Sequence, residues 1–394
     1  MKSLRLPIIT GLLAGVLAAG SAFALDLEIS GEVKTGLYYE TREQGGETYT
    51  YARIYNNDGD SGSAEGRIRL GMNLIAESFG IRTRFFQQNF LRGKALNDMS
   101  VEKVLVDFAY AYVNLLDNQF TVSAGLTGES PWGTGGPELY REVEYNDGGY
   151  PVMGIRTEWK PNFLPGLNLG FVLNRQDDTV PSDAVEKFGD LFLESVVGIA
   201  YEHDYFAFRF AYRFDRGIDS PAAIVNGDRF VYRVEERILG KLLPGMAIWA
   251  NGYCYGIGAE GKGSGRAAPG YIQNWFYASY DPEYFNTGVN VGYLDIFGNQ
   301  SNFQQLEIKP YFYWKFFDNL LVVGAMGGML IGFNNAKGFE DSFYNTWFIE
   351  PQVRVNINSG FYTALVYRFS SSPENLSGNK DTTHWLNIRL VYTF

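Results

Sequence analysis

Hydrophobic and polar residues alternate with a period of two along most of this chain. From Ile68 to Leu74 every second residue is apolar, and from Phe206 to Phe214 every second residue is aromatic. The last eleven residues, HWLNIRLVYTF, keep the same rhythm up to the carboxyl terminus. Because successive side chains of a strand point to opposite faces, this pattern predicts β-strands with one apolar and one polar face.

Short and long connections alternate between the predicted strands. The short ones are rich in Gly, Pro, Asn and Asp, as tight turns require. They lie at 77–78, 117–118, 161–165, 202–204, 240–244, 281–282, 318–319 and 358–360. The longer ones fall near 41–65, 91–101, 127–149, 175–190, 215–228, 257–269, 295–301, 334–342 and 371–383. This count predicts about eighteen strands, or sixteen if the ambiguous stretch 245–281 holds fewer.

An all-β fold of this size without a linker is typical of a transmembrane antiparallel β-barrel. Aromatic residues make up 16% of the 394-residue chain and glycines number 46, which suits strands and turns. A β-sandwich does not explain the strict alternation of short and long connections. The longest internal apolar run, 320–333, is too short and too rich in glycine for a spanning helix. We therefore expect long extracellular loops, short periplasmic turns, and a last strand that pairs with the first.

The first 24 residues have the features of a secretory signal peptide. Lys2 and Arg5 precede an apolar run, and Ala22-Phe23-Ala24 forms an A-x-A cleavage site. The predicted organisation is a signal peptide at 1–24 and a transmembrane β-barrel at 25–394. The formal charge of −11 argues against nucleic acid as a partner.

No pattern in the sequence predicts a cofactor, a metal site or an enzyme. The chain has one cysteine and two histidines, which is too few for clustered metal ligands. A hydrolase would need a serine beside a histidine, and His384 near Ser370 to Ser372 leaves that alternative open.

Ten arginines fall on the polar parity of predicted strands. A charge on the lipid face costs a few kcal/mol near the bilayer centre, so we expect these side chains to face a wet lumen. Two interpretations remain open, namely solvated wall residues without a specific task or a basic ladder that selects solutes. The residues are Arg67, Arg69, Arg82, Arg84, Arg156, Arg209, Arg213, Arg354, Arg368 and Arg389.

Aromatic residues near predicted strand ends suggest girdles at the two membrane interfaces. They are Tyr38, Tyr39, Phe79, Tyr110, Tyr112, Tyr201, Tyr205, Tyr280, Tyr284, Phe317, Tyr367, Phe369, Trp385 and Phe394.

The carboxyl-terminal strand resembles the assembly signal of outer-membrane β-barrel proteins of the Gram-negative type. That signal ends in phenylalanine, has an aromatic residue two positions earlier, and continues with apolar residues at alternate positions. Here the corresponding residues are Phe394, Tyr392, Leu390, Ile388 and Leu386. By size and strand count the whole chain resembles a porin. The resemblance implies outer-membrane lipid and the barrel assembly machinery as partners, and homo-oligomers are possible.

In porins the third extracellular loop folds into the barrel and narrows it. The resemblance implies that role for residues 127–149, whose acidic side chains would face the arginines across the lumen. They are Glu129, Glu138, Glu142, Glu144 and Asp147. The function expected from the sequence is passive diffusion of small hydrophilic solutes through a water-filled channel. The alternative is a surface-exposed adhesin, an interaction barrel without a transport role.

Overall fold

The computed structural model describes residues 26–54, 67–88, 105–127, 153–175, 195–214, 228–257, 270–297, 303–334, 346–372 and 381–394. The predicted signal peptide lies outside these ranges, so it stays a prediction. No helix in the described ranges is long and apolar enough to span a membrane.

Nineteen strands and one short helix form the described part of the chain. The bounds are β1 Asp26–Gln44, β2 Glu47–Ile54, β3 Arg67–Ile75, β4 Phe79–Gln88, β5 Leu105–Leu115, β6 Phe120–Leu126, β7 Met153–Trp159, β8 Leu167–Arg175, β9 Val196–Glu202, β10 Phe206–Arg213, β11 Asp228–Glu236, α3 Ile238–Leu242, β12 Met246–Ile257, β13 Gly270–Tyr280, β14 Phe285–Phe297, β15 Phe303–Phe316, β16 Leu321–Asn334, β17 Thr346–Asn358, β18 Phe361–Ser371 and β19 Thr382–Thr393.

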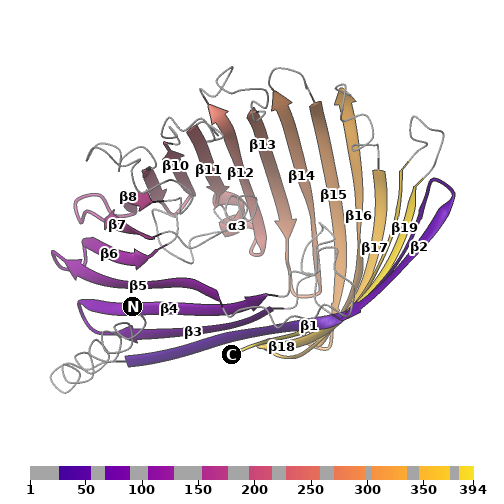
Figure 1. The fold of residues 1–394 in the computed structure, drawn as a ribbon, viewed down its shortest axis with the longest axis horizontal. Coiled ribbons are helices and arrows are strands. Elements are labelled where there is room, and N and C mark those ends of the chain that lie inside the picture. The colour runs from indigo at the N-terminus through magenta and orange to yellow at the C-terminus, as the bar shows by residue number, and fades with distance from the viewer. Residues whose placement is uncertain are drawn as a thin grey trace, which may run out of the picture.

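All the strands belong to one antiparallel sheet that closes on itself (Figure 1). Each strand except β2 pairs with the next along the chain, and β19 returns to pair with β1. Both β2 and β3 pair with the same edge of β1, one with its second half and one with its first. They lie end to end, so the nineteen strands occupy eighteen positions around the barrel. This confirms the predicted all-β barrel of eighteen strands.

The short connections lie where the sequence predicts them, and α3 lies within the one before β12. Two of them share an unusual backbone. Residues 116–118 and 317–319 all have φ between 52° and 68°. Asp and Asn tolerate this left-handed region better than other non-glycine residues, and each turn contains Asp-Asn. Turns of similar sequence and backbone conformation therefore connect the strands of two hairpins that are far apart along the chain.

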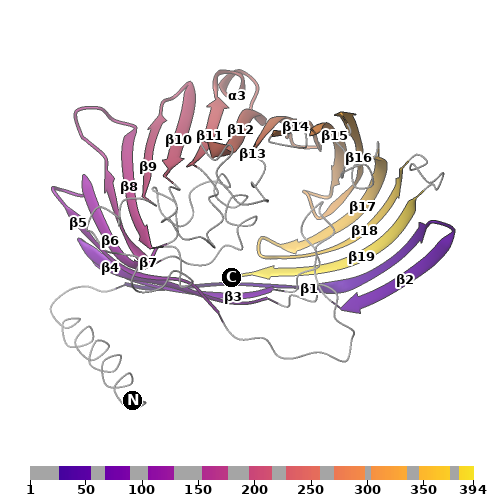
Figure 2. The same cartoon turned by 45° about the horizontal axis from the view of Figure 1, so that its top comes forward.

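The predicted first long connection, 41–65, is partly wrong. β1 continues to Gln44, and β2 returns along it after a tight turn at Gly45 and Gly46. Both glycines have positive φ, which two-residue hairpin turns require. Figure 2 shows this hairpin beside β19. Residues 47–54 alternate in polarity as a strand does, so this half of the predicted connection extends the barrel wall as β2.

The predicted pairing of the last strand with the first is confirmed. The register runs from Glu32 opposite Thr393 to Glu43 opposite Thr382. One step further, the amide of Gly31 donates to the carbonyl of Phe394 at 2.8 Å, and the amide of Phe394 donates back at 3.0 Å. The backbone of Phe394 is therefore part of the closed sheet, as an apolar solvent would demand.

Candidate functional site: the inner face of the barrel

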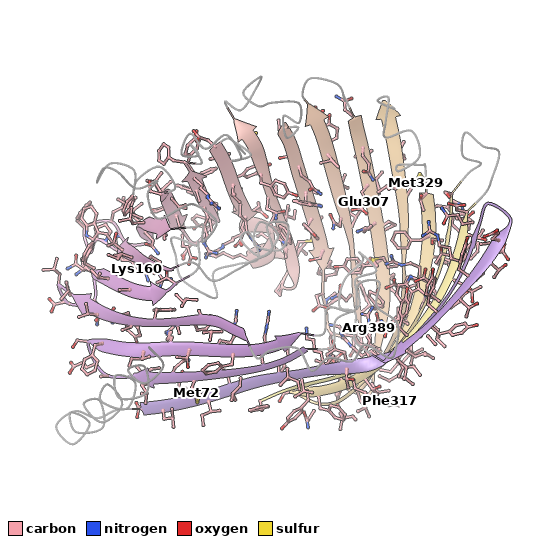
Figure 3. All side chains as sticks on the ribbon, viewed as in Figure 1. Met72, Lys160, Glu307, Phe317, Met329 and Arg389 are labelled. Carbon is pink, nitrogen blue, oxygen red and sulfur yellow. The ribbon has the colours of Figure 1, made fainter. Side chains whose placement is uncertain are left out.

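The two faces of the sheet differ sharply in chemistry. Large apolar side chains are exposed on the outer face along most strands, among them Leu27, Ile68, Val197, Trp314 and Leu386. Arginines, lysines, glutamates and amides occupy the alternate positions, which face inward. Figure 3 shows Met72 on the outside of the sheet and Arg389 within it. The inner face is therefore the candidate functional site.

Arg156 on β7 is the centre of one buried polar cluster. Its guanidinium donates to the carbonyl of Thr127 at 3.4 Å and to the hydroxyl of Ser123 at 3.3 Å. The carboxylate of Glu158 lies 3.4 Å from its Nε atom, and the ring of Tyr110 lies 4.9 Å from its Cζ atom. Only 3% of Arg156 is exposed. A charge this well enclosed is positioned and largely neutralised by its neighbours.

Arg368 on β18 forms a second cluster. Its Nε and Nη2 atoms lie 2.7 Å and 2.6 Å from one carboxylate oxygen of Glu350 on β17. The rings of Phe348 and Trp385 lie 4.2 Å and 5.1 Å from its Cζ atom. Tyr38 of β1 packs against Trp385 in the same region. Arg368 thus links four neighbouring strands across the seam of the barrel.

Two other predicted arginines also lie next to carboxylates. Arg69 on β3 is 3.8 Å from Glu32 on β1, which also pairs with Lys34 at 3.0 Å. Arg209 on β10 is 2.7 Å from Glu202 on β9. Both arginines therefore have a carboxylate of the barrel wall within ion-pair distance.

Arg82 on β4 and Arg354 on β17 differ from the arginines above. The structure gives each of them an aromatic neighbour and no carboxylate within ion-pair distance, in the described chain. Arg82 lies over the ring of Tyr112 at 5.6 Å, and Arg354 lies over Tyr362 at 5.7 Å. Their Nε atoms are buried without a hydrogen-bond partner. Within the described residues, the positive charge of these two side chains is therefore not compensated by a carboxylate.

The other arginines predicted to line the lumen have fewer described contacts. Arg84 lies over Phe108 at 4.7 Å, Arg213 is buried on β10, and Arg389 is half-buried on β19. The side chain of Arg67 is outside the described residues. So are the acidic residues Glu129, Glu138, Glu142, Glu144 and Asp147, and their predicted place in the lumen stays a prediction.

Sequence reasoning missed the acidic partners in the wall: Glu32, Glu158, Glu202 and Glu350. One of them could have been found. Arg156 and Glu158 are two residues apart on one strand, so period two places them on the same face. The pairs Arg69–Glu32 and Arg368–Glu350 join different strands, so they depend on the register.

The predicted aromatic girdle is wrong for four of its members. Tyr38, Tyr110 and Trp385 are buried on the inner face, and Tyr112 lies there beside Arg82. On their strands these four residues lie on the same face as the inward arginines. The face of the sheet, and not the position near a strand end, therefore decides where their rings lie. Tyr205, Tyr284 and Phe317 do lie exposed on the short turns.

His384 does not form a hydrolase site in the described structure. Its Nδ1 atom is 2.7 Å from the hydroxyl of Tyr367, and its ring packs against Phe369 at 4.9 Å. The partner is a tyrosine on the outer face, so the predicted alternative of a serine partner is not supported.

Comparison with solved structures places this architecture among known barrels. No protein-family model matches the chain, and no curated protein matches it. An anion-selective porin from Comamonas acidovorans has a TM-score of 0.53 at 11% identity, covering 94% of this chain and 100% of that one. The chain has a porin fold. OpdQ of Pseudomonas aeruginosa gives 0.53 at 10% identity, covering 94% and 98%. OccK11 (OpdR) of the same organism gives 0.51 at 11%, covering 94% and 96%.

Proposed function

We propose that this porin-fold barrel lies in the outer membrane and forms a water-filled channel for passive diffusion of small hydrophilic solutes. One observation carries the proposal: a closed barrel of eighteen strand positions has an apolar outer face and a charged, amide-rich inner face. Such a barrel satisfies its backbone in lipid and encloses a polar interior. The proposed partners are membrane lipid, the assembly machinery and the permeating solutes, with no catalytic step.

The channel is proposed to favour anions. Arg82 and Arg354 supply positive charge that no described carboxylate neutralises, and charge on a pore wall sets which ions pass. One neighbour with the same fold is an anion-selective porin, which supports this direction. The loop spanning 127–149 is proposed to narrow the channel, on the strength of the porin resemblance.

Conductance in a planar lipid bilayer tests the channel. The refolded mature chain is expected to give stepwise, steady currents that scale linearly with voltage. The same preparation heated in denaturant provides the control. A correctly folded barrel that inserts and stays electrically silent would contradict the proposal and favour the adhesin alternative.

A further inference from the structure

The inner face of β12 to β15 differs in chemistry from the arginine-rich wall around Arg82 and Arg354. Six aromatic side chains point inward from this sector, alternating with exposed apolar residues such as Phe276 and Trp314 on the outer face. The inward residues are Trp249, Tyr253, Trp275, Tyr277, Tyr311 and Tyr313. We call this surface the aromatic sector.

Charges in the aromatic sector compensate one another. Lys309 pairs with Glu307 at 2.9 Å on the same strand. Lys315 pairs at 2.5 Å with Asp281 in the turn before β14. Together with Asp281, the described inward residues of these four strands therefore carry no net formal charge. Arg233 of β11, which lies over the Trp249 ring, is paired with Glu235 at 2.8 Å. The surface therefore has no net charge that would favour an anion or a cation.

Two rings of the sector lie over glycines of the strand between them. A Cβ atom on Gly292 would come within 3.1 Å of the Trp275 ring, and one on Gly288 would come within 2.7 Å of the Tyr311 hydroxyl. Both glycines belong to β14, which β13 and β15 flank. The missing side chains let Trp275 and Tyr311 lean over β14, and both remain partly exposed.

Amide side chains stand between these rings. Asn290 is opposite Tyr277 on one side and Lys309 on the other, and Asn286 is opposite Tyr313. Both asparagine side chains are partly exposed, whereas their Oδ1 atoms are buried and accept no hydrogen bond within the part of the chain that the structure describes. Amide groups beside aromatic surface suit a ligand that has both hydroxyl groups and apolar C–H faces.

From this combination we propose that the aromatic sector binds neutral sugars as they pass through the channel. A sugar ring can pack its C–H face on the partly exposed ring of Trp275 or Tyr311, with its hydroxyl groups next to the exposed part of the asparagine side chains. The inference rests on the proposed channel function, because the surface lies on the inside of the barrel. It is independent of Arg82 and Arg354, which lie on β4 and β17.

The test compares two double variants with the full-length wild-type barrel. W275A/Y311A removes both rings, and F276A/F312A removes the next aromatic residue on each of the same strands, which faces outward. The probes are glucose trisaccharides with α-1,4 and β-1,4 linkages. Sugar-dependent reduction of the ionic current is measured in bilayers, and sugar binding is measured by equilibrium dialysis in detergent.

Sugar is expected to reduce the current of wild type and F276A/F312A equally. W275A/Y311A should keep its open conductance while the half-blocking concentration and the dissociation constant rise about ten-fold, since two ring contacts are lost. Equal values in all three proteins, or no binding to wild type, would overturn the sugar inference. If phenol or benzoate reduced the ionic current and the sugars did not, the proposal that the ligand is a sugar would be overturned. If the wild-type barrel bound sugar but conducted no current, the channel proposal would be overturned and the sugar-binding proposal would not.

Discussion

At the residue scale, the inner wall is organised by pairs of opposite charge at short range. Arg156 and Glu158 lie two residues apart on one strand, and Arg233 and Glu235 repeat the spacing at 2.8 Å. Opposite charges this close contribute little field at the centre of a pore, because each screens the other. Arg82 and Arg354, which have no carboxylate partner among the described residues, are therefore expected to act more strongly on solutes than these paired arginines.

The Arg368–Glu350 pair gives a prediction about stability. Its side chains are only 10% and 6% exposed, and the two charges need each other there. Glu350→Gln leaves the guanidinium uncompensated, and we expect the free energy of unfolding to fall by about 3 kcal/mol. Urea titration of the barrel refolded into lipid vesicles, followed by tryptophan fluorescence, measures the change.

The matched control removes both charges. The double variant Glu350→Leu with Arg368→Met replaces the pair by apolar groups of similar size and should recover most of the lost stability. If the single and double variants were equally unstable, packing rather than charge pairing would explain the effect.

At the element scale, closure depends on the pairing of β1 with β19. The ring of Phe394 lies directly over Gly31, where a Cβ atom would collide with it. Tyr392 packs against Phe394 on the outer face with ring centroids 5.6 Å apart. Because Gly31 has no side chain, it leaves the space at this seam that the Phe394 ring occupies.

Gly31→Ala should therefore weaken the barrel. The new methyl group displaces the Phe394 ring, and the expected loss is about 1 kcal/mol of unfolding free energy. Gly327→Ala on β16 is the matched control, because the nearest atom to its new Cβ is 3.8 Å away. Without a collision, alanine reduces the freedom of the unfolded chain and should stabilise by about 0.5 kcal/mol. The two substitutions should thus shift the urea midpoint in opposite directions, and a shared direction would contradict the role of Gly31.

At the scale of the whole molecule, the lumen has two chemically different sectors. The sector on β1, β3, β4 and β17 to β19 carries arginines, whereas the inner face of β12 to β15 is aromatic and without net charge. Charged and neutral solutes can therefore contact different parts of the same wall.

Ion selectivity tests the arginine sector. Arg82→Gln with Arg354→Gln removes two positive charges that have no carboxylate partner among the described residues. The permeability ratio of chloride to potassium should fall about two-fold, as judged from the reversal potential in a salt gradient. Arg209→Gln with Glu202→Gln removes a compensated pair and should leave the ratio unchanged. A ratio that stayed constant in the first variant would remove anion selection from these residues.

The barrel fold could be predicted from the amino-acid sequence. The two-residue period of apolar positions predicts the strands, and the turn residues predict the hairpins. The same period places Arg156 and Arg368 on the polar face of their strands. Each of these features depends only on residues that are close along the chain. The same parity also places Tyr38 and Trp385 inside, although their position near strand ends suggested a girdle.

Which charged side chains lie next to each other could not be predicted from the sequence. Glu32 lies beside Arg69 and Glu350 beside Arg368 because strand register brings them opposite each other, and register is a property of two strands rather than of one. The glycines beneath Trp275 and Phe394 belong to neighbouring strands for the same reason. Local periodicity therefore specifies the faces of this barrel, whereas the charge pattern and aromatic sector of its lumen arise from contacts between strands.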